Sequence, residues 1–307
     1  MIPGGTNLAA LATNAAYEST LLFNAAQTST AVPPSETPTV SPTITLTLPP
    51  TETPTPTETP TPTATKLPVV VLATATPELT DVPMTNFGPG RVEIPILMYH
   101  HFSEDPIYER YTVSPKVFGE QLKWLHENGY RTISLANFAN AVNYGKRLPS
   151  KSFVITIDDG NADVYSVAYP LMKQYGYTAT VFLIANTVGT YNVLDADMVK
   201  ELHRNGWEFG SHSMSHTDLL ANNVDLDYEI CQSKKTLEEM LGININFFAY
   251  PFGSANERTM YIASECKYWA AVGTGVNDRG TVLFYLPRRE VQADYTMEQF
   301  QALLKDQ

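Results

Sequence analysis

Residues 152–160 read SFVITIDDG, a continuous apolar run that ends in two adjacent acids and a glycine. A run without polar alternation is typical of a strand that is buried on both faces of a parallel sheet. Asp158 and Asp159 would repel each other unless positive charge lay nearby, so the pair indicates a cation close to the strand end. Gly160 permits a tight turn out of the strand that aims both acids to one side.

Similar apolar runs alternate with amphipathic stretches from Ile94 onward. The helix expected over 114–129 has Ser114 as its N-cap and Gly129 at its end. Further helices are expected over 136–144, 163–175, 196–205, 226–241, 256–267 and 297–305. Strands are expected over 94–102, 130–135, 152–160, 178–185, 207–213, 246–253, 268–275 and 285–291. Repeated strand–helix units over about 215 residues favour an α/β barrel related to the eight-fold one.

Four of the six histidines lie at ends of these predicted strands, as the acid pair does. His100 and His101 end the first strand, and His212 and His216 come at the end of the fifth. The carboxyl ends of barrel strands meet at one face, where active sites are built. We therefore expect these side chains to form a single site.

The spacing of His212 and His216 indicates a metal site, because one helical turn would place both rings on the same side. Two imidazoles and one carboxylate make the three-ligand set of catalytic zinc and related ions. Such an ion would hold one acid of the pair ionised and leave the other to accept a proton from water. In the alternative interpretation the acids cap the next helix and the histidines are ordinary loop residues, but their gathering at successive strand ends favours the metal.

The composition of the chain changes near residue 90. We predict a weakly structured N-terminal segment over 1–31, a disordered Pro/Thr-rich linker over 32–90 and a folded domain over 91–307. The linker, which contains PPTETPTPTETPTPTAT, has too little apolar surface to offset the entropy of ordering. Such stalks are typical of glycosylated spacers on exported proteins, so an extracellular or cell-surface location is expected, with an intracellular linker as the alternative.

The net charge of −12 and the pI near 4.9 argue against a nucleic-acid binder that uses a basic face. No apolar stretch approaches the ~18 residues of a membrane span, and no charged signal-peptide start is visible. Cys231 and Cys266 lie in no C-x-x-C motif. We expect two buried free thiols, with a disulfide as the alternative, in a monomeric protein.

The motifs TIDDG at 156–160 and SHSMSH at 211–216 resemble those of the polysaccharide deacetylases of carbohydrate esterase family 4. The resemblance covers about residues 94–304, and PILMYHHF, YPFG and LPRREV are similar to the branch that contains the poly-N-acetylglucosamine deacetylases. It implies an irregular seven-stranded (β/α) barrel. It also implies removal of acetyl groups from N-acetylated sugars, or of O-acetyl groups from xylan in some members.

The resemblance also implies roles for individual residues. Asp158 matches the catalytic base, and the metal ligands match Asp159, His212 and His216. Phe252, after a proline, falls where a backbone N–H helps to bind the oxyanion.

Two positions depart from the usual pattern of that family. The arginine expected two residues before the proline is Ala249, and the late Leu-x-His motif, which supplies the general acid, ends in Arg288. The biofilm branch is thought to take its acid from the first strand, which corresponds to His100. Arg288 could supply the charge missing at Ala249, with a surface or core-flanking arginine as the alternative.

We therefore expect metal-dependent deacetylation of an N-acetylated polysaccharide with release of acetate. The substrate would be poly-N-acetylglucosamine, a chitin-like polymer or the peptidoglycan glycan, and the ion Zn²⁺, with Co²⁺, Ni²⁺ or Mn²⁺ as alternatives. The competing functions are an O-acetyl xylan esterase and a non-catalytic cell-surface glycan-binding protein. Asp158 beside a complete ligand set argues against the latter.

Overall fold

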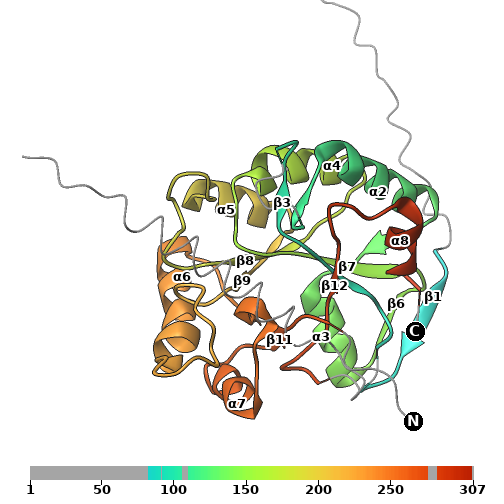
Figure 1. Cartoon of the computed structure of the whole chain (residues 1–307). Coiled ribbons are helices and arrows are strands. Elements are labelled where there is room, and N and C mark those ends of the chain that lie inside the picture. Colours follow the sequence, from blue (N-terminus) through green and yellow to red (C-terminus); the bar gives the residue numbers. More distant parts are fainter. Residues whose placement is uncertain (1–81, 91, 106–109, 276–281, 306–307) are drawn as a thin grey trace, which may run out of the picture. The chain divides into compact units, whose positions relative to one another are not determined.

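The computed structural model describes residues 82–90, 92–105, 110–275 and 282–305 (Figure 1). The predicted N-terminal segment and most of the predicted linker lie outside the described residues. The end of the linker region differs from the expectation, because Met84–Phe87 forms strand β1. β1 pairs antiparallel with β6, Lys146–Pro149. Both strands are largely exposed, so neither carries the apolar pattern that marks a strand in the sequence.

A curled parallel sheet with the strand order β11–β10–β9–β8–β7–β2–β12 forms the core of the domain (Figure 1). Its strands are β2 (Ile96–Tyr99), β7 (Ser152–Ile157), β8 (Thr180–Leu183), β9 (Glu208–Ser211), β10 (Phe247–Ala249), β11 (Ala270–Val272) and β12 (Arg289–Glu290). These seven strands make a half-barrel, which confirms the expected fold. The two-residue strand β5 (Arg131–Thr132) pairs with the start of β7.

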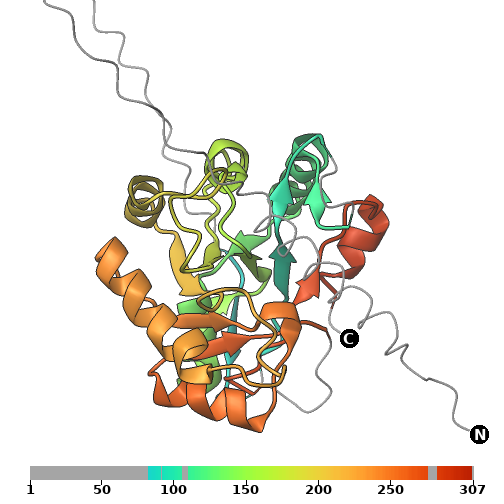
Figure 2. The ribbon, with the colours of Figure 1, turned by 60° about the vertical axis from the view of Figure 1, so that its left-hand side comes forward.

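Helices follow most of the strands and cover the outer face of the sheet (Figure 2). They are α2 (Pro115–Glu127), α4 (Tyr169–Lys173), α5 (Ala196–Arg204), α6 (Ser233–Leu241), α7 (Glu257–Glu265) and α8 (Met297–Ala302). The helices predicted at 163–175 and 226–241 begin as π-helical turns, η1 (Val164–Ala168) and η2 (Asp227–Gln232). Two short parallel strands, β3 (His101–Phe102) and β4 (Thr112–Val113), lie outside the main sheet. Within the described ranges, no helix combines the length and the apolar character of a membrane span.

The two faces of the sheet bury different apolar layers, as the period of two along a strand requires. Along β7, Phe153 and Ile155 pack in the layer that contains residues of the outer helices. Val154 belongs instead to an inner layer with Phe182 and Val272. The inner layer fills the half-barrel, so a side chain on this face at a strand end lies at the open end of the barrel.

Helix α3, Leu135–Tyr144, closes the opposite end. Its apolar face belongs to the inner layer, and the N–H of Leu135 donates to Glu208 Oε2 at 2.8 Å. Glu208 begins β9, so α3 lies where the strands start. The end where the strands finish is therefore left for a functional site.

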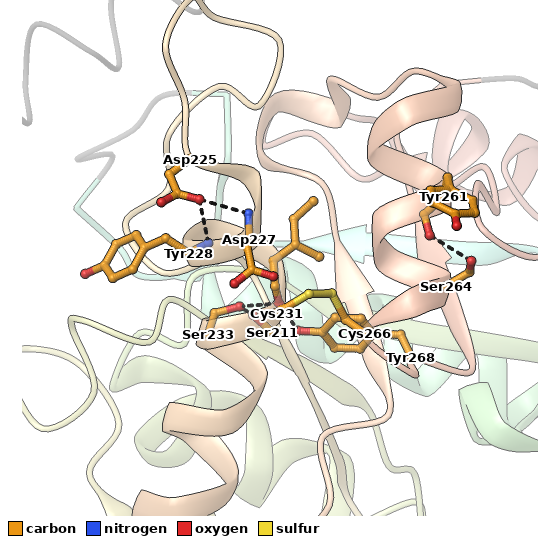
Figure 3. The surroundings of a disulfide bond; sticks show 11 residues. Ser211, Asp225, Asp227, Tyr228, Cys231, Ser233, Tyr261, Ser264, Cys266 and Tyr268 are labelled. Carbon is orange, nitrogen blue, oxygen red and sulfur yellow. Dashed lines mark hydrogen bonds between the residues drawn. A yellow bond between two sulfur atoms is a disulfide. The ribbon is translucent and has the colours of Figure 1, made fainter.

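The two cysteines form a disulfide, so the expectation of two free thiols is wrong (Figure 3). Cys231 lies in η2 and Cys266 directly follows α7. These helical segments follow the neighbouring strands β9 and β10, which brings the two Cα atoms to 5.1 Å, within the usual range for a disulfide. The pairing arises from the order of strands in the sheet, which two cysteines 35 residues apart do not reveal.

Candidate active site

The acid pair and the predicted histidines meet at the carboxyl end of the half-barrel. His100 follows β2, Asp158 and Asp159 follow β7, and His212 follows β9. Asp158 continues the inward-facing series of Val154 and therefore points into the barrel. Strand ends thus position these groups, as expected for a parallel sheet.

Asp159, His212 and His216 form a cluster whose ligand atoms all lie within 4.8 Å of one another. Asp159 Oδ1 is 3.7 Å from Nε2 of His212 and 3.7 Å from Nε2 of His216. These distances are too long for hydrogen bonds. They match ligand atoms that surround one ion at 2.0–2.2 Å, which lie roughly 3–4 Å apart. Two imidazoles and one carboxylate therefore fit a divalent transition metal.

The ring of His212 is oriented by the backbone of β10. Its Nδ1 lies 2.9 Å from the carbonyl oxygen of Ala249, so the Nδ1–H donates there and Nε2 faces the cluster with its lone pair. A hydrogen bond of this kind is the usual outer support of a metal-binding histidine. Burial lowers the pKa of His212 to about 4, although Asp158 acts to raise it, so the imidazole is neutral at pH 7.

Asp159 is ionised as well. Burial acts to raise its pKa, but the neighbouring histidines, His216 first, outweigh this effect and hold the pKa of Asp159 below its ordinary value. The backbone at Asp159 is left-handed, with φ of 69°. Gly160 follows with φ of 73°, and a Cβ there would come within 2.6 Å of Leu183 Cδ2. The predicted role of Gly160 in the turn is confirmed.

His212 and His216 are not brought together by a helical turn, which corrects the expectation from their spacing. Residues 212–216 form a loop in which Ser213 and His216 are left-handed, with φ of 65° and 60°. The two rings nevertheless lie with centroids 4.8 Å apart. The hydroxyl of Ser213 accepts a hydrogen bond from the N–H of His216 at 2.8 Å and stabilises this loop conformation.

Glu229, in η2, stabilises the same loop through hydrogen bonds and was not predicted from the sequence. Its side chain is only 5% exposed, and Oε2 accepts hydrogen bonds from the N–H groups of Met214 at 3.1 Å and Ser215 at 3.0 Å. Oε1 accepts a third from the hydroxyl of Ser215 at 2.6 Å. In the sequence, Glu229 looks like a solvated helix residue, because only the loop geometry shows which backbone donors need an acceptor.

Arg288 forms a two-pronged ion pair with Asp158. Nη1 lies 2.6 Å from Oδ1 and Nη2 lies 2.7 Å from Oδ2. Arg288 is 1% exposed and its Nε donates to the carbonyl oxygen of Gly273 at 2.9 Å, so its guanidinium is buried beside Asp158 and does not lie on the surface. Burial acts most strongly and raises the pKa of Asp158, but Arg288, together with His212 and His100, outweighs burial and holds that pKa well below its usual range. Positive charge therefore does lie next to the acid pair.

His100 also lies close to Asp158. Its Nε2 is 3.9 Å from Asp158 Oδ2, and its ring contacts Tyr111 with centroids 4.5 Å apart. Burial lowers the pKa of His100, while Asp158 and Asp159 act to raise it. The adjacent His101 turns elsewhere, with Nδ1 3.3 Å from Asp163 Oδ2.

Phe252 comes to the same place from β10. It lies in the turn η3, Pro251–Gly253, with φ of 58°, and its ring meets the ring of His216 edge-on at 4.7 Å. Of the seven left-handed non-glycine residues in the described part of the chain, four belong to this site: Asp159, Ser213, His216 and Phe252. Strained backbone of this kind concentrates where a fold holds functional groups in place.

The chain is similar to proteins that act on polysaccharides. Residues 145–271 match the sequence profile described as polysaccharide deacetylase. YxkH of Bacillus subtilis strain 168, a predicted polysaccharide deacetylase, is 32% identical over 216 residues, which cover 69% of this chain and 76% of YxkH. The poly-beta-1,6-N-acetyl-D-glucosamine N-deacetylase of Staphylococcus aureus strain MRSA252 is 27% identical over 212 residues, 64% of this chain and 73% of that enzyme.

A solved structure shows the same fold. The Streptococcus pyogenes deacetylase PplD, in complex with acetate, superposes with a TM-score of 0.63 at 28% identity. The match covers 70% of this chain and 99% of that one.

Proposed function

This chain belongs to the polysaccharide deacetylase family, and on that premise we propose that it hydrolyses the acetamido groups of an N-acetylated polysaccharide and releases acetate. We further propose that Asp159, His212 and His216 hold a divalent ion, with Zn²⁺ as the first choice because nitrogen and oxygen ligands in a three-residue set suit it. Co²⁺, Ni²⁺ and Mn²⁺ are the alternatives. The convergence of this cluster with Asp158 at the carboxyl end of the parallel sheet carries the proposal.

A bound ion would lower the pKa of water and polarise the acetyl oxygen. Asp158 is then the base that takes the proton from the attacking water. Its pairing with Arg288 keeps the carboxylate ionised and fixes its direction.

Two further groups complete the proposed reaction. The backbone N–H of Phe252 donates to the oxyanion that forms on the acetyl carbonyl, a contribution of ~3 kcal/mol for a single donor of this type. His100 protonates the nitrogen of the leaving amine. Because burial lowers the pKa of His100, its resting form is neutral. Nε2 of His100 lies 3.9 Å from Oδ2 of Asp158. The proton that Asp158 takes from water can therefore pass to His100, which then donates it to the amine.

The proposed location is extracellular or at the cell surface. The disulfide Cys231–Cys266 supports it, since disulfides persist mainly in oxidising compartments. The proposed substrate is poly-N-acetylglucosamine, as in the name of the Staphylococcus aureus relative, or a chitin-like or peptidoglycan glycan. The expectations of a monomer and of no nucleic-acid partner stay predictions.

A comparison of two acetylated glycans tests this function. We expect acetate release from N-acetylglucosamine oligomers, with amines appearing in equal amount, and little from acetylated xylan. Quantification of acetate and free amine in the same reaction measures both products. Release from xylan alone would show that the protein is an O-acetyl esterase, and release from neither would favour a glycan-binding protein without catalysis.

A second prediction concerns Glu229. Glu229→Ala should lower metal affinity at least tenfold, because Met214 and Ser215 lose their acceptor and the loop that carries His216 is released. Glu229→Gln should keep part of the affinity, since its amide oxygen can still accept one of these bonds. Competition with a chromogenic chelator measures the affinity. Equal affinity in Glu229→Ala and the native protein would show that the loop needs no such support.

A further inference from the structure

A hollow of about 330 Å³ lies at the other end of the barrel, near the start of β11. It is lined by Ala139, Asn140, Asn143 and Tyr144 of α3 and by Trp269. Trp269 directly precedes β11, and α3 covers the end where the strands begin. The acid pair and its histidines follow strand ends instead. The hollow is therefore separate from the proposed active site, and none of its residues takes part in that chemistry.

Two aromatic rings give this hollow its character. Tyr144 is 78% exposed and Trp269 is 51% exposed. The indole meets the buried ring of Phe247 edge-on, with ring centroids 6.2 Å apart, and the backbone N–H of Trp269 donates to the carbonyl oxygen of Asn246 at 2.7 Å. Two exposed aromatic rings that line one hollow offer faces on which a ligand can stack.

The other lining groups specify the chemistry of that ligand. Asn140, Asn143 and Tyr144 are spaced i, i+3, i+4 and so share one face of α3. Each carboxamide offers two donors and one acceptor oxygen, which suits hydroxyl and acetamido groups. No lining residue is acidic or basic, and a chain of net charge −12 repels polyanions. Flat aromatic faces beside neutral amides match a sugar ring, whose C–H groups stack on the aromatic face while its hydroxyls bind the amides.

We propose that this hollow binds a segment of neutral N-acetylated glycan, apart from the segment that is deacetylated. The choice of an acetylated glycan rests on the proposed function. The volume of the hollow is at the small end of the ~300–1,000 Å³ range of ligand sites, so the hollow accepts a short stretch of polymer. A second contact on the same polymer raises the effective concentration of substrate without changing the chemistry. The second contact should therefore strengthen the binding of long glycan chains and leave the binding of short oligomers unchanged.

The full-length protein tests this inference with soluble glycol chitin, a polymer of N-acetylglucosamine units, in affinity electrophoresis with chelator present to prevent turnover. Trp269→Ala should weaken retention at least fivefold, and Trp269→Tyr should recover most of it because a stacking ring remains. Tyr261→Ala removes an aromatic side chain on α7 that is 64% exposed and should behave as the native protein does. Acetate release from short oligomers should be unchanged in all three variants.

Retention of Trp269→Ala equal to that of the native protein would overturn the glycan site. A change in sedimentation of Trp269→Ala without loss of glycan retention would overturn it as well, in favour of a contact between copies of the chain. If native protein released no acetate but Trp269→Ala still lost retention, the proposed deacetylation would fail while the glycan site stood. If the native protein released acetate normally but Trp269→Ala kept its retention, the glycan site would fail while the proposed deacetylation stood.

Discussion

Replacing Asp158 with asparagine should lower acetate release by roughly 10²–10⁴-fold, the usual worth of a positioned base. The variant should keep its metal, because Asp159, His212 and His216 are unchanged. The neutral amide of the asparagine is not basic enough to take a proton from water. Metal content and acetate release, measured on the same preparation, separate the two effects.

The ion pair with Arg288 complicates that variant and also supplies its control. Asp158→Asn leaves a buried guanidinium without its anion, which should destabilise the fold by ~3–5 kcal/mol. Arg288→Gln alone should destabilise in the same way, because it strands the buried carboxylate. The double variant Asp158→Asn/Arg288→Gln removes both charges, so it should recover stability relative to either single change. It should not recover activity.

Thermal unfolding of the four proteins, together with their acetate release, completes this cycle. Activity that returned with stability in the double variant would mean that Asp158 acts as a structural partner of Arg288 and not as the base. Full activity in Asp158→Asn would have the same meaning.

His216→Ala should lose bound metal and activity together while the barrel stays folded, because two ligands cannot retain the ion that three hold. Asp159→Asn should weaken metal binding less, since an amide oxygen replaces the anionic ligand, and excess Zn²⁺ or Co²⁺ should restore part of its rate. Metal analysis after gel filtration, followed by titration with each ion, measures both changes. His126→Ala, in α2 and exposed, is the matched histidine control.

Rescue by excess metal distinguishes the two acids. If Asp158→Asn were rescued and Asp159→Asn were not, the assigned roles of base and ligand would be reversed. If His216→Ala kept a full equivalent of metal, His216 would not be a ligand.

The sequence predicted the sheet well because its strands are buried on both faces. SFVITIDDG and the other apolar runs contain so many consecutive Val, Ile and Phe residues that both faces of each strand must be buried. The strands set the site in turn, since residues that follow β2, β7 and β9 must meet at one end of a parallel sheet. Asp158, Asp159 and His212 could therefore be placed together from their order alone.

The features that were missed depend on contacts between distant segments. Arg288 was expected to supply positive charge at the site, but its ion pair with Asp158 joins residues 130 apart, and nothing near LPRREV shows that this arginine is buried. The bonds of Glu229 to the loop after His212 need the left-handed backbone at Ser213, which a spacing of four residues does not predict. The disulfide of Cys231 depends on which helices are neighbours around the barrel. Local patterns predict elements, whereas these contacts follow from the assembled topology.

The most direct test of the account is acetate release from N-acetylglucosamine oligomers by one preparation in three states: as purified, stripped by chelator, and reloaded with one equivalent of Zn²⁺. We expect activity that falls to background on stripping and returns on reloading, in proportion to the metal bound. Full acetate release from the stripped protein, with metal below one hundredth of an equivalent, would contradict a metal-assisted site at Asp159, His212 and His216.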